Sequence, residues 1–561
     1  MTLIKSFLLG SAAGIVAVAS AQAADLPTRK AAPVEYVRIC NVGGITGWTL
    51  PGSDTCVKFS GYITAQFEGG NLETEYNWGA VSSLAPTSAA TTTMVTTTTG
   101  ATVAVPVPGL AAPITGVPAA TAAAIEAFGD SRQTQRVLIA GNTTQRNTTY
   151  YRDATGWTTR ANFGFDMASN TAYGPLIGHF DLNAENGQYF DNTGTSVYIN
   201  TAYLTWAGIT AGKQQSFFSF TGGGDNWANF FSPDRKGFNE PELIAYTASF
   251  GGGFSATLSA ETPGTVGGSG SGTDSGAPNY AHPGGNEGGL GNLNTLTTTF
   301  AGQRWPDFVG ALHVKQGWGE AQVSGVLHNV NVYDSVYNNT ATCGLTGTFV
   351  CNGSHGQVGW AVDGGVKYNL PSFGAGDNIL VTGEYGQSAT WYSGLTGEAM
   401  WGEWGQTNGN GQPMFLPDAF FNPLTNSWSK PNTWSVSGLF EHHFTPQFYV
   451  DLEGSVGGYN WSNMGGGCNI AGPGCLLAQA AQGPLSKSGT AWLIGADLGW
   501  NPVTNLNFDL ELMYMDLNQQ RPSGFVGTIY NFGAANEFFV PGDWKGNSNG
   551  FAGRFRITRY F

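Results

Sequence analysis

The stretch LNFDLELMY, residues 506–514, alternates apolar and polar side chains with a period of two. One face is apolar and carries Leu506, Phe508, Leu510, Leu512 and Tyr514. The opposite face carries Asn507, Asp509 and Glu511. Such alternation indicates a β-strand between an apolar and a polar environment. The same period recurs in WTTRANFGFDM (157–167) and FYVDLEGSV (448–456), so strands of this kind are the repeating unit of the chain.

The connections between these strands alternate between tight turns and long loops. Turn signals occur at 169–174, 251–253, 316–319, 370–376, 445–446 and 502–504. Long stretches rich in Gly, Asn, Thr and Pro occupy 262–304, 388–431, 460–488 and 517–548. A transmembrane β-barrel has short periplasmic turns at one rim and long extracellular loops at the other. A β-sandwich has no reason to sort its loops in this way.

Counting strands under this alternation gives sixteen. They are predicted at 57–67, 157–168, 175–186, 196–206, 208–216, 242–250, 254–261, 307–315, 319–329, 358–369, 377–387, 432–444, 447–459, 489–501, 505–516 and 549–561. An even number suits a closed antiparallel barrel, and about sixteen strands enclose a lumen wide enough for water. The predicted fold is therefore all-β, a 16-stranded antiparallel transmembrane β-barrel.

The N-terminal region has the pattern of a secretory signal peptide over residues 1–23. Lys5 precedes a short apolar run, and the small residues Ala21 and Ala23 precede a predicted cleavage site after Ala23. A membrane-anchoring helix is the alternative, but the run falls short of the roughly 20 residues that a spanning helix needs. Residues 24–55 are expected to form a periplasmic segment, and residues 56–561 the barrel of the bacterial outer membrane.

The composition is unusual for a protein with a single compact core. Only 11% of the 561 residues are charged and 83 are glycine, whereas about 25% charged is typical. The formal net charge of −15 argues against nucleic acid as a partner. The acidity suggests a bias among permeating ions, with a solvated surface that only aids solubility as the alternative. No long apolar helix is expected, because the nearest candidate, 99–125, contains four prolines.

The six cysteines fall into three close pairs, which predicts local disulfides in an oxidising compartment. The pairs are Cys40 with Cys56, Cys343 with Cys351, and Cys468 with Cys475. A bridge from Cys40 to Cys56 would hold the N-terminal segment at the foot of the barrel, where VEYVRI (34–39) is a candidate for a short extra strand. The pairs lie far apart without histidine clusters, so we expect no metal and no cofactor.

The first external loop, predicted at 68–156, contains a stretch from 76 to 125 without any charged residue. Its Thr- and Pro-rich composition predicts an exposed low-complexity extension, with or without some β-pairing. No specific function is expected there.

Several motifs resemble the alphaproteobacterial general-porin family, the type found in Brucella and rhizobia. The resemblance rests on EYVRIC, PGSDTCVKFSGY, GITAGKQQSFFSF, AYTASFGGGFSATLSAE, WPDFVGALHVKQGWGEAQVSG, GWAVDGGVKYNLP, WSVSGLFEHHFTP and WNPVTNLNFDLELMY. It implies a water-filled barrel, usually a homotrimer, whose third external loop, here 217–241, folds inward and narrows the channel. One departure lies in YGPLIGHFDL, where Ile177, His179 and Asp181 stand where relatives tend to have arginine, so no anion preference is carried over.

The residues expected at the pore constriction are charged. Those of the loop region are Asp225, Asp234, Arg235, Lys236, Glu240 and Glu242. Those of the wall are Lys58, Arg160, Arg554 and Arg556. Pairing of the first and last strands is expected to gather Lys58, Arg554 and Arg556 into one basic patch. Our hypothesis is a transverse field between acidic loop and basic wall; alternatively, the charges only keep the lumen wet.

The aromatic stretch FFSFTGGGDNWANFF (217–231) is expected to pack against the inner wall of the barrel, because a surface loop would leave its rings in water. The last strand, 549–561, ends with Phe561 and resembles the signal that the barrel assembly machinery reads. Arg559 departs from that signal, which usually has an apolar residue there.

These features predict a passive diffusion channel for ions and small hydrophilic solutes, with a weaker expectation of cation preference. Outer-membrane lipid and lipopolysaccharide are the expected surroundings. An enzyme is not expected, because no nucleophile lies beside a base at a recognisable spacing and the neighbours His442 and His443 point to opposite faces of a strand. The rival from another class is a surface adhesin or structural barrel with a plugged lumen.

Overall fold

The computed structural model describes most of the predicted strands and some of their connections. The described residues are 38–70, 92–97, 102–106, 114–117, 155–188, 195–220, 241–262, 296–300, 304–336, 354–393, 419–422, 427–461, 488–520, 527–531, 537–541 and 548–561.

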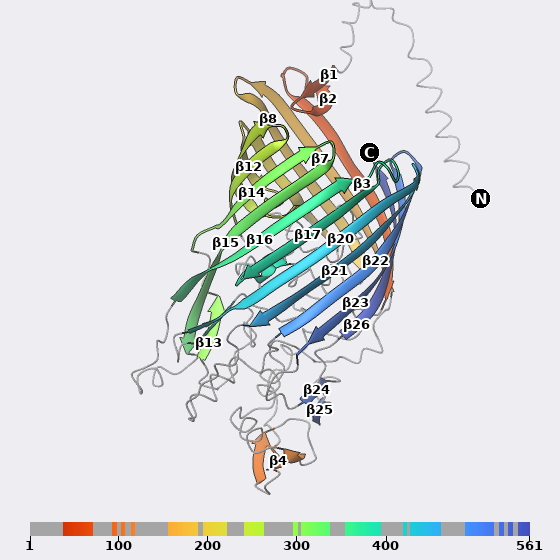
Figure 1. The fold of residues 1–561 in the computed structure, drawn as a ribbon. Coiled ribbons are helices and arrows are strands. Elements are labelled where there is room, and N and C mark those ends of the chain that lie inside the picture. The colour runs from red at the N-terminus through yellow and green to blue at the C-terminus, as the bar shows by residue number, and fades with distance from the viewer. Residues whose placement is uncertain are drawn as a thin grey trace, which may run out of the picture.

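Sixteen antiparallel strands of this described part form a closed barrel (Figure 1). They are β3 (Cys56–Gly70), β7 (Thr155–Thr171), β8 (Gly174–Gln188), β9 (Thr195–Trp206), β10 (Ile209–Lys213), β11 (Glu242–Gly251), β12 (Phe254–Glu261), β14 (Asp307–Gln316), β15 (Gly319–Val336), β16 (Ser354–Asn369), β17 (Asn378–Gln387), β20 (Pro431–Thr445), β21 (Phe448–Trp461), β22 (Ser488–Val503), β23 (Leu506–Gln519) and β26 (Ser548–Tyr560). Each pairs with its neighbour in this order, and β26 pairs with β3 to close the ring. The sixteen predicted strands and the fold class are confirmed.

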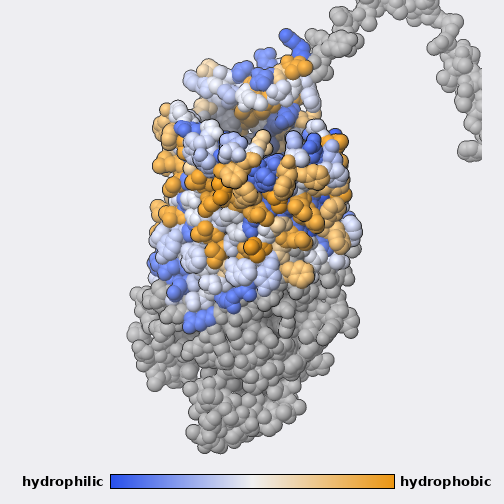
Figure 2. Space-filling view, turned by 45° about the vertical axis from the view of Figure 1, so that its right-hand side comes forward, coloured by the Kyte–Doolittle hydropathy of each residue, from blue (hydrophilic) through white to orange (hydrophobic). Residues whose placement is uncertain are grey.

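The period-two pattern sorts side chains between the two faces of the wall. On β23, Leu510, Leu512 and Tyr514 are exposed on the outside, whereas Glu511 is buried on the lumen side. Figure 2 shows the result as a hydrophobic belt around the middle of the barrel, with hydrophilic residues toward both ends. Such a belt is the surface that lipid requires of a membrane barrel.

Tight turns join the strands at the upper rim in Figure 1. The turn between β11 and β12 needs glycine, because Gly251, Gly252 and Gly253 all have positive φ, at 84°, 60° and 82°. Some strand ends differ from the prediction, and β15 runs to Val336 instead of ending at residue 329. β10 ends at Lys213 instead of continuing to residue 216, because Ser216 and Phe217 turn away from the wall to bind Glu261.

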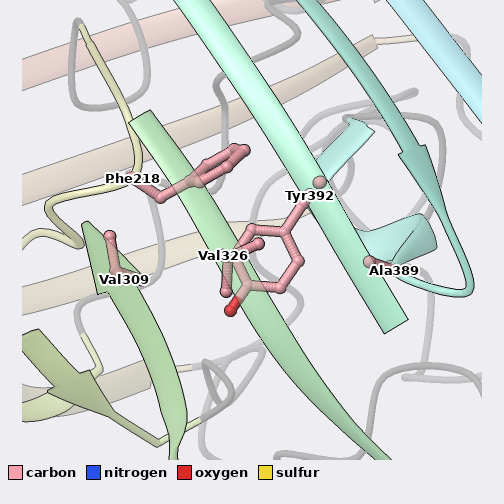
Figure 3. Close-up of a cluster of buried hydrophobic side chains, with 6 residues drawn as sticks. Phe218, Val309, Val326, Ala389 and Tyr392 are labelled. Atoms are coloured by element: carbon pink, nitrogen blue, oxygen red, sulfur yellow. The ribbon is translucent and has the colours of Figure 1, made fainter. Parts of the chain in front are cut away.

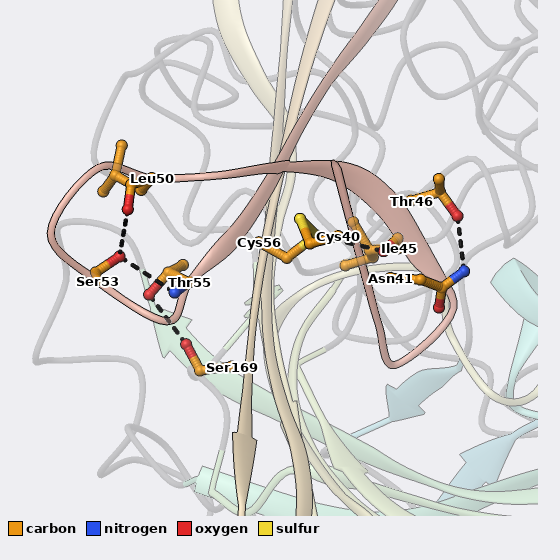
Figure 4. The surroundings of a disulfide bond; sticks show 9 residues. All are labelled: Cys40, Asn41, Ile45, Thr46, Leu50, Ser53, Thr55, Cys56 and Ser169. Atoms are coloured by element: carbon orange, nitrogen blue, oxygen red, sulfur yellow. Dashed lines mark hydrogen bonds between the residues drawn. A yellow bond between two sulfur atoms is a disulfide. The ribbon is translucent and has the colours of Figure 1, made fainter. Parts of the chain in front are cut away.

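An extra hairpin sits at the rim of the tight turns. It consists of β1 (Ile39–Val42) and β2 (Ile45–Thr49), and β2 also pairs with the start of β3. The predicted disulfide between Cys40 and Cys56 is confirmed and fastens the hairpin to the barrel (Figure 4). VEYVRI contributes only Ile39 to a described strand, and β2 was not expected. The other two predicted disulfides, Cys343 with Cys351 and Cys468 with Cys475, lie outside the described residues.

Small strands occur in the long connections. β4 (Thr92–Thr97), β5 (Thr102–Pro106) and β6 (Ile114–Val117) form a three-stranded sheet within the uncharged stretch 76–125, so that stretch is partly β-paired. The others are β13 (Leu296–Phe300), which pairs with β15, and the pairs β18 (Phe420–Asn422) with β19 (Ser427–Ser429) and β24 (Gly527–Asn531) with β25 (Glu537–Pro541). A short 3-10 helix, η3, spans Thr390–Ser393.

None of the helices in the described ranges is long and apolar enough to cross a membrane.

Candidate functional site in the barrel lumen

The root of the third loop enters the barrel and packs against the inner wall. Phe218 is fully buried and meets Tyr392 of η3 edge to face, with ring centroids 4.8 Å apart (Figure 3). Val309 of β14 and Val326 of β15 complete the contact from the wall. Phe220 also lies against the wall, since a Cβ on Gly365 would be only 2.2 Å from its ring. The prediction that the aromatic stretch packs inward is confirmed for Phe218 and Phe220; residues 221–231 lie outside the described part.

Glu261, at the end of β12, fixes the first residues of this loop. Its side chain is fully buried and accepts hydrogen bonds from Ser216 Oγ, at 2.5 Å, and from the Phe217 N–H, at 3.1 Å. On the other side, Ser324 Oγ donates to the Phe218 carbonyl at 2.5 Å. A buried carboxylate is tolerated when donors surround it in this way.

Asp307, at the start of β14, is the second buried carboxylate at the loop root. Its Oδ2 lies 2.7 Å from His328 Nδ1 and accepts a hydrogen bond from the Tyr392 hydroxyl. Its Oδ1 accepts from the Asn329 N–H at 3.1 Å. Asp307 thus ties η3 to β14 and β15. We call Glu261, Asp307, His328 and Tyr392, together with residues 216–218, the loop anchor.

The predicted constriction residues of the loop are mostly outside the described part of the chain. They are Asp225, Asp234, Arg235, Lys236 and Glu240. The placement of Glu242 in the constriction is wrong. It begins β11 on the same face as Ile244 and Tyr246, whose side chains are exposed on the outside of the wall.

The predicted basic patch is only partly formed. Arg554 and Arg556 both face the lumen on β26, opposite Glu68 and Gln66 of β3. Lys58 does not join them and lies opposite Asp166 of β7. It stands eight residues along β3 from Gln66, which is roughly 26 Å at about 3.3 Å per residue. Sequence alone could place these residues on lumen faces but could not supply the register that separates them.

Charges on the wall of β7, β8 and β9 are paired with one another. Arg160 of β7 forms an ion pair with Glu185 of β8. His179 lies between Asp166, at 2.6 Å, and Asp181, at 3.5 Å. Asp181 also accepts hydrogen bonds from the Thr201 N–H and Oγ. His179 and Asp181, noted as a departure from arginine, therefore belong to one hydrogen-bonded network with Asp166 and Thr201.

The wall of β20 to β23 is different, because carboxylates there are direct cross-strand neighbours. Glu441 pairs in register with Asp451, Asp451 with Asp497, and Asp497 with Glu511. We call these four residues the acidic row. The row ends at Arg554, which is the register partner of Glu511.

A lumen cavity of about 420 Å³ lies over this wall. It is lined by all four residues of the acidic row, by Asp509, by Arg554 and Arg556, and by Tyr62, Tyr449 and Tyr560 among others. Sequence reasoning missed the row as a site. The sequence does show polar residues at every second position of the predicted strands 447–459, 489–501 and 505–516. Only the register between the strands shows that their carboxylates align.

The rim of the tight turns holds a further polar group. Asp377, in the turn before β17, accepts a hydrogen bond from the His443 N–H at 2.8 Å and lies 2.5 Å from His442 Nδ1. Asp377 thus contacts both residues, although their rings lie on opposite faces of the strand as predicted: His442 lies beside Phe440, and His443 lines the lumen cavity beside Tyr449. Hydrogen bonds, led by that from the His443 backbone, hold the pKa of Asp377 below its usual value. In the described ranges, no group of three or more His, Cys, Asp or Glu side chains could hold a metal ion.

A closed barrel with an apolar exterior and a charged, cavity-bearing interior is the architecture of a transmembrane β-barrel channel. A family profile described as "Porin subfamily" matches residues 25–103 and 128–542. The chain belongs to this family of outer-membrane porins, whose members are channels and not enzymes.

The chain is also similar to individual proteins. Porin Omp2b of Brucella suis is 25% identical over 419 residues, which is 69% of this chain and 86% of the relative. Porin Omp2b of Brucella neotomae is 26% identical over 398 residues, 65% of this chain and 80% of the relative. Among solved structures, the outer membrane channel DcaP of Acinetobacter baumannii aligns with a TM-score of 0.47 at 10% identity, over 92% of this chain and 99% of that one.

Proposed function

We propose that this porin is a water-filled passive diffusion channel for ions and small hydrophilic solutes. The observation that carries the proposal is the lumen wall itself, where charged side chains line a cavity inside a closed barrel. Charges and polar groups along a pore favour hydrated solutes over apolar ones. No covalent chemistry is required of any residue.

Planar-bilayer recording of the refolded protein tests this function. We expect discrete current steps, and a conductance that sugars small enough to enter the pore lower and that sugars too large to enter leave nearly unchanged. Absence of discrete steps would contradict a channel and favour an adhesin or structural barrel with a plugged lumen.

We further propose that the lumen charges create a field across the channel. The support is the side-by-side placement of the acidic row and the arginines of β26. The loop residues proposed to project into the constriction from the opposing side are Asp225, Asp234, Arg235, Lys236 and Glu240. Arg160 of β7 and Lys58 of β3 are proposed to contribute to the field from their own part of the wall. Such a field orients water and slows apolar solutes more than polar ones.

The variant Arg554→Ala, Arg556→Ala tests the field. Because the acidic row then loses its adjacent cations, we expect the reversal potential in a salt gradient to shift toward that of a cation-selective channel. Arg559→Ala is the matched control, since Arg559 is exposed on the same strand and donates to the Asn505 carbonyl. Unchanged ion selectivity in the double variant would contradict the proposed field. A wild-type reversal potential near zero would argue against cation preference.

The remaining assignments concern assembly. We propose cleavage after Ala23, supported by a family match that begins at residue 25, with residues 24–55 in the periplasm and 68–156 as the first external loop. N-terminal sequencing of the mature protein should begin at Ala24. We also propose a homotrimer in outer-membrane lipid and lipopolysaccharide, on family likeness; the mass of the detergent-solubilised complex tests it.

Phe561 is proposed as part of the signal for the barrel assembly machinery. Its N–H donates to the Gly61 carbonyl at 3.0 Å, and its ring lies over Gly61, where a Cβ would be 2.7 Å from Phe561 Cζ. Deletion of Phe561 is expected to lower the amount of barrel in the outer membrane, whereas the purified variant should still refold in detergent.

A further inference from the structure

Gly365, on the lumen face of β16, leaves room for the ring of Phe220. A Cβ at position 365 would lie 2.8 Å from Phe220 Cβ and closer still to the ring atoms Cγ and Cδ1. Carbon atoms that are not bonded to one another pack best at about 3.5–4.0 Å. The ring of Phe220 therefore occupies the space that any side chain at position 365 would need.

The backbone of β16 does not itself require glycine at this position. Gly365 does not have a positive φ, and the pairing of β16 with β15 and with β17 continues through it without a bulge. Glycine in the interior of a strand weakens the strand, and it often marks a place where another group approaches the backbone closely. The group that approaches Gly365 is the root of the third loop.

A second glycine of the wall shows how this contact differs from an ordinary pair within the sheet. A Cβ on Gly499 would overlap the ring of Tyr449, but Tyr449 is the cross-strand partner of Gly499. An aromatic ring over a glycine in such a pair stabilises the sheet itself. The cross-strand partners of Gly365 are Gln322 and Thr382, and its ring comes from the loop. Gly365 therefore acts as a seat for a segment outside the sheet.

The loop anchor fixes the chain two residues before Phe220. The Phe218 carbonyl accepts hydrogen bonds from Ser324 Oγ at 2.5 Å and from Gln322 Nε2 at 3.3 Å. Gln322 is also a register partner of Gly365, so the strand beside the seat holds the same part of the loop. Because the wall blocks the outward direction, a ring displaced from the seat moves toward the axis of the channel and takes the following chain with it.

We propose that Gly365 is a positioning residue that sets the width of the channel, because it allows Phe220 to lie flush with the wall. Gly365 acts through Phe220 and through the loop that follows it. The proposal rests on the proposed channel function and deepens it, since it names a wall residue without a side chain as a determinant of solute size.

Single-channel recording of Gly365→Ala in planar bilayers tests the proposal. The added methyl group displaces Phe220 toward the lumen, so we expect a lower conductance than in wild type and a smaller size limit for the sugars that enter. Gly364→Ala is the matched control. Gly364 lies on the outer face of the same strand, where a Cβ would meet only the Gln322 carbonyl oxygen, at 4.0 Å. An equal change in both variants would overturn the proposal.

The double variant Gly365→Ala, Phe220→Ala separates the contact from general damage to the strand. Without the ring the methyl group has room, so adding Gly365→Ala should leave the conductance of Phe220→Ala unchanged. A further drop in the double variant would contradict the seat. A Gly365→Ala channel as wide as wild type would refute control of the pore width.

Unfolding of the same refolded variants in denaturant measures the contact without any current. Gly365→Ala should lower the free energy of unfolding when Phe220 is present and should not lower it in the Phe220→Ala background. Equal losses in the two backgrounds would show that Gly365 does not seat the ring. If wild type gives no current steps, the channel function is refuted together with control of the pore width, and the unfolding cycle still decides the contact.

Discussion

The loop anchor and the acidic row both bury carboxylates inside the barrel, but they treat them in opposite ways. At the anchor, Asp307 and Glu261 accept hydrogen bonds from side chains and backbone N–H groups of other segments. In the row, Asp497 has carboxylates as register neighbours on both sides. The anchor surrounds its carboxylates with donors from other segments, whereas the row places carboxylates side by side on neighbouring strands. Substitutions in the two regions should therefore change the free energy of unfolding in opposite directions.

The largest effect is expected for Asp307→Ala. The change leaves His328 and the Tyr392 hydroxyl buried without their acceptor, and breaking a buried pair in this way costs about 3–5 kcal/mol. The free energy of unfolding in denaturant, measured on the refolded barrel, should fall by that amount. Single-channel conductance should also rise as the loop root loosens. Asp54→Ala, an exposed turn residue, is the control, and equal stability of the two variants would contradict an anchoring role.

A smaller loss is expected for Glu261→Gln. An amide replaces one acceptor oxygen by an N–H donor and removes the charge, so Ser216 Oγ and the Phe217 N–H can no longer each donate to a carboxylate oxygen of its own. The unfolding free energy should drop by about 1–3 kcal/mol. Glu242→Gln provides the comparison, since Glu242 lies on the paired strand β11 and is exposed. A Glu261→Gln barrel as stable as this control would show that Glu261 does not fasten the loop.

Asp497→Asn should have the opposite sign. Removing one of the four aligned carboxylates relieves repulsion, so we expect the unfolding free energy to rise by up to about 1 kcal/mol. Asp181→Asn, on the paired wall, should instead lower it, because Asp181 accepts from Thr201 and lies beside His179. The comparison fails if both substitutions change stability in the same direction.

The smallest effect concerns the rim and depends on pH. The pKa of Asp377 is lowered in the folded state, mainly by the His443 N–H, so its contribution to stability is present above the unfolded pKa of about 3.9. That contribution is lost as the pH falls through the lower folded value. The stability difference between wild type and Asp377→Asn should therefore shrink as the pH is lowered from about 5 to about 2. A difference independent of pH would exclude ionised Asp377 as its source.

The sequence predicted the strands far better than the site. Period-two alternation depends only on neighbours along the chain, so all sixteen strands could be found, along with the Cys40 to Cys56 bridge. The electrostatic contacts depend on the register between strands. A register shift of two residues changes which side chains are neighbours but leaves every side chain on the same face of the sheet. For this reason Lys58 was wrongly grouped with Arg554 and Arg556, and the alignment of Asp451, Asp497 and Glu511 was not foreseen.

The pairing of β26 with β3 also determines when the barrel can form. Thr64 and Thr558 meet at this seam with their hydroxyls 3.2 Å apart, although 494 positions separate them in the sequence. The entropic cost of closing a loop grows slowly, by about 0.6 kcal/mol per doubling of its length, so the long separation adds little to the free energy of forming the seam at equilibrium. Its difficulty is kinetic, since contacts of such long range form slowly. Until the last strand pairs, both edges of the open sheet present unpaired backbone groups, which makes this folding intermediate prone to aggregation. A chaperone or assembly factor that covers these edges would shorten the time for which they are exposed.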